Sequence, residues 1–151
     1  MANKRFAFGD PESTMSHLIP RYMLLQAGIP KGLPDNHQFL GSHKNVAIGV
    51  LVGDFDAGAM KKEVFDEFAP KGLKALAMTP GVPDHVFVAR SDLPPETVAK
   101  LRKALLHLGR RPMGADILGR LHRGLSDLIP TQDQDFDALR DMVKKVDAQN
   151  P

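Results

Sequence analysis

The chain lacks cysteine and tryptophan, has one tyrosine, Tyr22, and contains no long apolar run. Without cysteine it has no disulfide and no thiolate metal site, and its redox compartment stays open. No stretch approaches the ~20 apolar residues of a membrane span, so no membrane insertion is expected. Aromatic residues make up only 6% of the chain, which leaves few side chains that could stack on nucleic-acid bases.

What is present fits a globular domain. The chain has 151 residues, of which 42% are hydrophobic and 25% charged, so it can bury a true core. Its 20 Lys and Arg nearly balance its 18 Asp and Glu, and this balance does not indicate a nucleic-acid partner. The first residues include no apolar segment typical of a signal peptide, so we expect no export signal in the chain as given.

The first half of the chain alternates short β-type runs with helix-type runs. This alternation predicts an α/β fold with a mostly parallel sheet covered by helices. The predicted strands are Arg5 to Phe8, His37 to Gly41, Asp56 to Met60, Leu73 to Met78 and His85 to Arg90. The predicted helices cover residues 16–27, 43–52, 61–68, 92–108 and 114–122, and a last helix begins between 131 and 135. Two prolines and a glycine at 79–84 predict a crossover or hinge after the first part of the chain.

Three hydroxyl residues, Ser13, Thr14 and Ser16, join the first predicted strand to the first predicted helix. In a parallel sheet, ligands bind at this edge. Free backbone N–H groups and the helix dipole attract an anion there, and hydroxyls add uncharged donors. The same residue types are also ordinary helix caps, which is their commoner role. The local chemistry therefore leaves anion binding and capping both open.

Four further residues are candidates for the same edge. His43 follows the second predicted strand, where a ring nitrogen could donate to an oxyanion, although a surface histidine near a cap is the simpler interpretation. Glu63 opens the third helix and could hold a protonated ligand oxygen or simply complement the dipole. Asp84 and His85 flank the crossover strand and could face the cleft or be solvated loop groups.

Enzymatic interpretations have less support. Ser13, His43 and Asp84 could be named as a hydrolase triad, but no Gly-x-Ser-x-Gly elbow is present. The histidines lack metal-ligand spacing such as His-Glu-x-x-His, and no Walker-type phosphate loop occurs. We therefore expect a protein without catalysis, metal or cofactor.

The order of the motifs resembles the C-terminal half of the phosphate, phosphite and phosphonate solute-binding proteins of ABC transporters. The matching segments are FAFGDPEST at 6–14, LIPRYMLL at 18–25, AGI at 27–29, GSH at 41–43, VLVGDFDAGA at 50–59 and PDHVFVARSDLP at 83–94. The resemblance implies one lobe of a periplasmic-binding-protein-like fold, a three-layer α/β/α sandwich with extra C-terminal helices. By this resemblance, residues 4–80 would form the oxyanion-binding lobe, and residues 81–151 the crossover strand and the C-terminal helices that pack on the lobe or on a partner copy.

The resemblance also implies a ligand set. Family members hold the oxyanion with a Ser-Thr-Ser run at this helix start, with the histidine of the Gly-Ser-His segment and with acidic residues further on. Carried over, these are Ser13, Thr14, His43 and Glu63, with a last acidic position at Asp84 or His85. The chain departs from the pattern at Met15, where a third hydroxyl residue is usual, and at Ser16, where glycine is common.

Partners and location follow from the same resemblance. It implies a small oxyanion ligand such as phosphonate, phosphite or phosphate, an ABC transporter permease, and a place in the periplasm or cell envelope. Family members have an N-terminal lobe that closes over the ligand, so half a cleft is expected to bind weakly. The C-terminal helices of family members pack partly on that N-terminal lobe. Here they would have to bury their apolar faces on this lobe or on a second copy of the chain, so we expect a homo-oligomer. A structural or regulatory lobe that dimerises without binding ligand tightly is the alternative.

Overall fold

The computed structural model describes residues 4–83, 85–122 and 124–149. Contacts within the chain define two compact units, which are described separately. The first, the sheet unit, comprises Met1–Val82 and Asp137–Pro151, and the second unit comprises Pro83–Phe136. The C-terminal helix therefore belongs with the N-terminal sheet, while the roles predicted for residues 4–80 and 81–151 stay a prediction.

A small parallel sheet forms the centre of the sheet unit. Its strands are β1, Arg5–Phe8, β2, Asn36–Phe39, and β3, Ala57–Gly58, and their order is β2-β1-β3. Both pairings are parallel, with Phe8 opposite Phe39 and Ala7 opposite Gly58. The mixed α/β fold with a parallel sheet is therefore confirmed. Since all three strands run the same way, their carboxyl ends share one edge.

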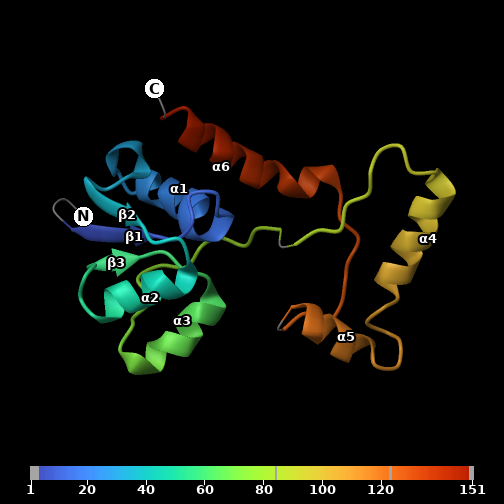
Figure 1. Ribbon diagram of the computed structural model, residues 1–151. Coiled ribbons are helices and arrows are strands. Elements are labelled where there is room, and N and C mark those ends of the chain that lie inside the picture. Colours follow the sequence, from blue (N-terminus) through green and yellow to red (C-terminus); the bar gives the residue numbers. More distant parts are fainter. Residues whose placement is uncertain (1–3, 84, 123, 150–151) are drawn as a thin grey trace. The chain divides into compact units, whose positions relative to one another are not determined.

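Helices cover both faces of this sheet (Figure 1). They are the π-helical turn η1, Thr14–Leu18, α1, Ile19–Gln26, the 3₁₀ turn η2, Pro30–Gly32, α2, His43–Leu51, α3, Lys62–Phe68, the 3₁₀ turn η3, Ala69–Lys71, and α6, Asp137–Asp147. The first predicted helix is thus divided, because Pro20 lacks an N–H and stands near the start of its regular part. The second and third helices lie where the sequence predicts them.

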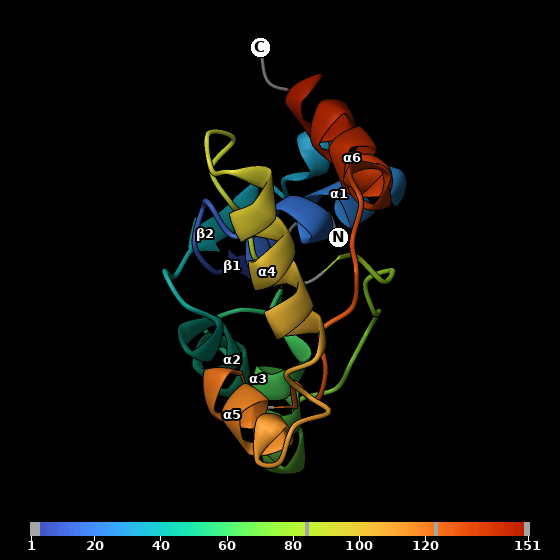
Figure 2. The same ribbon diagram turned by 90° about the vertical axis from the view of Figure 1, so that its right-hand side faces the viewer.

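Side chains along β1 point alternately to the two faces of the sheet, and helices pack against both faces, which gives three layers. Phe6 and Phe8 point to one face, where they form a core cluster with Leu24 of α1. Ala7 and Gly58 point to the other face, which α2 covers so closely that a Cβ on Gly58 would lie 2.5 Å from Val46 Cγ1. Figures 1 and 2 both show α6 alongside α1, where Lys145 Nζ lies 5.6 Å from the centre of the Tyr22 ring.

The second unit is built from α4, Pro95–Leu106, α5, Gly114–Leu121, and the 3₁₀ turn η4, Asp133–Phe136. Its helices agree with the sequence pattern. The strands predicted at Leu73–Met78 and His85–Arg90 are wrong, because the described residues of both segments form no strand. A strand needs a hydrogen-bonded neighbour, and neither segment has one; Leu76 and Val88 are instead 80% and 86% exposed. In the described part of the chain, no helix is long and apolar enough to cross a membrane.

Candidate oxyanion-binding site

The loop after β1 leads directly into the start of η1. Ser13 is the N-cap of this turn, and its Oγ accepts a hydrogen bond of 3.1 Å from the backbone N of Ser16. The Ser13 backbone N–H donates to Asp10 O at 3.0 Å. Capping uses a lone pair of the Ser13 hydroxyl and leaves its proton able to donate to a ligand. The two roles that the sequence left open are therefore compatible at this residue.

Ser16 lies beneath this loop. It is only 1% exposed, and its Oγ makes no hydrogen bond to any residue that the structure describes. A Cβ on Gly9 would lie 2.2 Å from that oxygen, so the loop can pass over Ser16 only because residue 9 is glycine. An unpaired buried hydroxyl costs about 1–3 kcal/mol, which marks this position as unusual within the core.

The loop after β2 lies beside the first loop. Gly41 N donates to Gly9 O at 3.1 Å, continuing the strand pairing beyond β1 and β2. Ser42 then caps α2, with its Oγ accepting a 3.1 Å hydrogen bond from Asn45 N. Two helix starts thus face the same edge of the sheet, and their N-terminal dipole ends and free N–H groups favour an anion between them.

His43 occupies the first position of α2. Its Nδ1 accepts a 3.1 Å hydrogen bond from the backbone N of Lys61, which follows β3. Because Nδ1 is an acceptor, the neutral ring carries its proton on Nε2. Partial burial lowers the pKa of His43, the charge of Lys61 lowers it further, and Glu63 opposes both. His43 therefore favours a neutral Nε2–H donor.

The remaining predicted residues have different placements. Glu63 lies in the first turn of α3, exposed, and close enough to His43 to act on its pKa. His85 belongs to the second unit, where its ring centre lies 5.3 Å from that of His122. Asp84 lies outside the described residues. The structure thus brings Ser13, Thr14, Ser16, His43 and Glu63 to one sheet edge, while Asp84 and His85 stay predictions.

An aromatic cluster next to the first loop was missed by the sequence analysis. The His17 ring packs edge-on against Phe8 and Phe39, with centroids 5.4 and 4.8 Å away. Its Nδ1 lies 2.6 Å from Pro11 O, and its buried Nε2 makes no hydrogen bond to a described residue. His37 joins from β2, 5.9 Å from Phe8. The sequence did contain a signal for this cluster. Phe6 and Phe8 are two positions apart on one strand, as are His37 and Phe39 on the next, and such residues share one face of a sheet.

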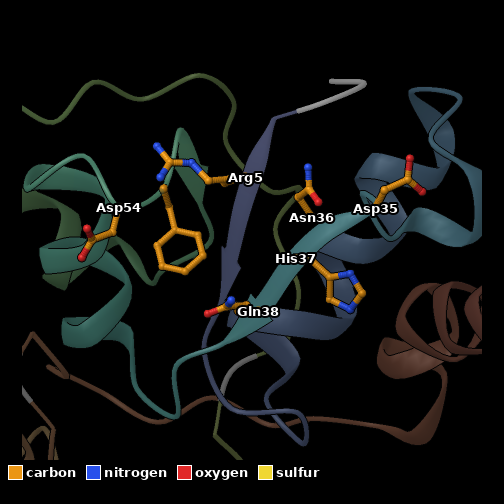
Figure 3. A pocket seen from close by; sticks show the side chains of 7 residues that line it. Arg5, Asp35, Asn36, His37, Gln38 and Asp54 are labelled. Atoms are coloured by element: carbon orange, nitrogen blue, oxygen red, sulfur yellow. The ribbon is translucent and has the colours of Figure 1, made fainter.

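A hollow lies at the opposite, amino edge of the sheet (Figure 3). It has a volume of about 750 Å³ and is lined by Arg5, Asp35, Asn36, His37, Gln38, Asp54 and Phe55. Arg5 is already engaged there, because its Nη2 donates to Gly53 O at 2.8 Å. Two carboxylates in the lining repel an anion, so this hollow does not suit an oxyanion. The described residues include no group of three or more side chains that could hold a metal ion.

Solved structures of other proteins share the fold of this chain. Over 97% of its length the chain is similar to PhnD1 from Prochlorococcus marinus (MIT 9301) in complex with methylphosphonate, with a TM-score of 0.77 and 27% identity, and it covers 58% of that chain. XAC2383 from Xanthomonas citri, bound to chloride ion, has the same fold, with a TM-score of 0.77 at 22% identity over 98% of this chain and 59% of its own.

Sequence relatives agree with the fold. The probable ABC transporter phosphite binding protein PhnD1 of Prochlorococcus marinus (strain MIT 9301) is 38% identical in an alignment of 103 residues, and the match covers 62% of this chain and 34% of that protein. The phosphate-import protein PhnD of Mycolicibacterium smegmatis is 30% identical in an alignment of 115 residues, and the match covers 67% of this chain and 36% of the relative. The chain thus spans about a third of the length of these curated relatives.

Residues 1–136 match the family of periplasmic substrate-binding proteins of phosphonate ABC transporters, and the chain belongs to this family. The resemblance inferred from the motifs is therefore confirmed. The expectation of a binding protein rather than an enzyme is confirmed as well, because the family binds substrates for transport.

Proposed function

We propose that the chain binds a tetrahedral oxyanion, such as a phosphonate, phosphite or phosphate, at the carboxyl edge of its sheet. Ser13 and Thr14 would donate from the start of η1, and His43 would donate from Nε2. Glu63 would accept from a protonated ligand oxygen, and Asp84 or His85 would complete the contact set. Ser16 would support the loop from below and could add its unpaired hydroxyl.

The observation that carries this proposal is the hydrogen bond from Lys61 N to His43 Nδ1. It ties the loop after β3 to the helix after β2 and directs the ring proton to Nε2. A neutral donor binds an anion without first having to take up a proton, so binding would persist at neutral and mildly alkaline pH. Helix capping alone gives no reason for this arrangement.

Calorimetric titration with methylphosphonate, phosphite and phosphate tests the proposal. We expect saturable heat with at least one of the three ligands. His43→Ala should remove the heat, while His107→Ala in the second unit should leave it unchanged. Absence of heat with every ligand at millimolar concentration would refute the proposal.

By family membership, the chain would act in the periplasm or cell envelope and deliver its ligand to an ABC transporter permease. Binding to detergent-solubilised permease in a pull-down, stronger with ligand than without, would support this role. Equal recovery with an unrelated permease would count against it.

The second candidate function is that of a structural or regulatory lobe that self-associates. Exposed apolar side chains favour it, notably Phe87 and Leu121 in the second unit and Met78 in the sheet unit. Light scattering across a concentration series would detect a homodimer. A constant monomer mass together with saturable ligand heat would leave only the first function.

A further inference from the structure

Positive charge is concentrated in one segment of the second unit. Residues 97–115 contain Lys100, Arg102, Lys103, Arg110 and Arg111 but no Asp or Glu, whereas the whole chain carries a formal charge of only +2. This segment covers most of α4 and the turn that follows it (Figure 1). The near balance of charge over the whole chain therefore conceals a strongly basic stretch.

The basic side chains converge on one side of α4. Lys100, Lys103 and His107 are spaced three and four positions apart, so they share a helix face. The turn after α4 adds two arginines, and together these residues surround an open hollow of about 490 Å³, lined by Lys100, Lys103, Ala104, His107, Arg110 and Arg111. We call this surface the basic face of α4.

Most of this charge has no ion-pair partner among the residues that the structure describes. Lys100 pairs with Glu96, their Nζ and Oε1 atoms lying 2.5 Å apart. Lys103, Arg110 and Arg111 form no salt bridge with any of residues 4–83, 85–122 or 124–149, and all three are exposed. Neighbouring cations on one helix repel one another, so the cluster does not stabilise α4. Its charge is available to an external anion.

The composition of the face indicates which anion fits. Specific protein interfaces depend on buried aromatic or large aliphatic anchors, and the only apolar residue in this lining is Ala104. The lining also has few polar groups other than cations. Clusters of about four to eight Lys and Arg on a helix are typical of surfaces that bind anionic lipid headgroups. An open, shallow face suits a flat array of charges better than a single small ligand.

We propose that the basic face of α4 binds the surface of an anionic phospholipid membrane. Attraction of this kind acts over about one Debye length, ~10 Å at 0.1 M salt, and needs no inserted segment. It would concentrate a transporter component at the membrane where its permease resides. The proposal does not depend on oxyanion binding, since none of the residues of the basic face belongs to the sheet edge.

Co-sedimentation with lipid vesicles tests this proposal. The 151-residue chain should bind phosphatidylcholine vesicles that contain about 30% phosphatidylglycerol and should ignore pure phosphatidylcholine. The double variant Lys103→Gln/Arg110→Gln should lower the partition coefficient about 20- to 30-fold, from a loss of about a factor of five per cation. Added salt at about 0.5 M should release the protein.

The matched control removes the same charge elsewhere. Lys74→Gln/Lys144→Gln takes two exposed lysines from the sheet unit and should change partitioning less than about threefold. Circular dichroism would establish that both double variants are folded. Equal losses in the two variants would overturn the proposal, because net charge alone would then explain the binding. Absence of vesicle binding by the wild type would overturn it too, and would redirect attention to an acidic protein surface.

Discussion

The two units differ sharply in how much apolar surface they bury. In the sheet unit, Phe8, Ile19 and Val46 are fully buried, and α1, α2, α3 and α6 each contribute buried residues. In the described part of the second unit, Leu118 is the only fully buried large side chain, and α4 has no buried residue at all. Well-formed helices therefore do not by themselves indicate a core.

Local signals explain why α4 forms nonetheless. Pro95 stands at its first position, Glu96 lies in its first turn, and Lys100 follows Glu96 at helical spacing. The sheet unit depends instead on contacts between distant parts of the chain, such as β1 with β3. We thus expect substitutions in the sheet unit to act on global stability and those in α4 to act mainly on surface properties.

The largest effect is expected from Phe8→Ala. The Phe8 ring is fully buried between the aromatic cluster and α1, so its loss should cost about 3–5 kcal/mol of unfolding free energy. Leu101→Ala, at a position 49% exposed on α4, should cost less than about 1 kcal/mol. Urea denaturation followed by far-UV circular dichroism measures both. Similar costs would contradict the contrast between the units.

Gly9→Ala should be next in size. The new Cβ would lie 2.2 Å from Ser16 Oγ and 2.7 Å from Ser16 Cβ, an overlap that should cost about 1–3 kcal/mol. Adding Ser16→Gly should recover a large part of that loss, since it removes both overlapping atoms. A double-mutant cycle in urea would measure the coupling. Strictly additive effects would show that the two residues do not meet.

Ser13 allows stability and binding to be separated. Ser13→Ala removes the cap and should lower stability by about 1 kcal/mol. Ser13→Asp retains a capping oxygen and should leave stability within about 0.5 kcal/mol, yet its carboxylate should abolish oxyanion binding by charge repulsion. Thermal melts and calorimetry on the same samples test this. Unchanged ligand affinity in Ser13→Asp would show that Ser13 does not contact the ligand.

The smallest predicted effect is a pH dependence. The folded state lowers the pKa of His43, so the unfolded chain binds a proton there more readily. The stability that neutral His43 contributes is complete above the unfolded pKa, near 6.5, and is lost as pH falls from there through the folded pKa. Stability of the wild type should therefore fall more between pH 7 and 5.5 than that of His43→Gln. If the stability of the wild type and of His43→Gln changed with pH in parallel, a lowered pKa of His43 in the folded state would be contradicted.

Much of the architecture could be predicted from local pattern. The strand Arg5–Phe8, the cap at Ser13 and the helices of the second unit all coincide with sequence signals, because periodicity and capping act over a few residues. The apolar runs at 73–78 and 85–90 were misjudged, because an alternating or apolar run specifies a strand only when a neighbour pairs with it. Pairing is a non-local property.

The sequence indicates where the candidate oxyanion site lies, but not how its side chains are arranged. Parallel strands place Ser13 and His43 at one edge, which the sequence order indicates. The tautomer of His43 depends on the backbone N–H of Lys61, 18 residues further on, and no local pattern indicates that contact. The packing of Ser16 against Gly9 depends likewise on how η1 turns back beneath the loop.

The two edges of the sheet give the most direct test of the central claim. Methylphosphonate titrated into ¹⁵N-labelled protein should shift the backbone amide resonances of residues 9, 10 and 12–14, of Ser42 and His43, and of Lys61. The amides around Arg5 and Asn36, at the opposite edge, should not move. Shifts confined to that opposite edge, or no shifts at millimolar ligand, would contradict the account.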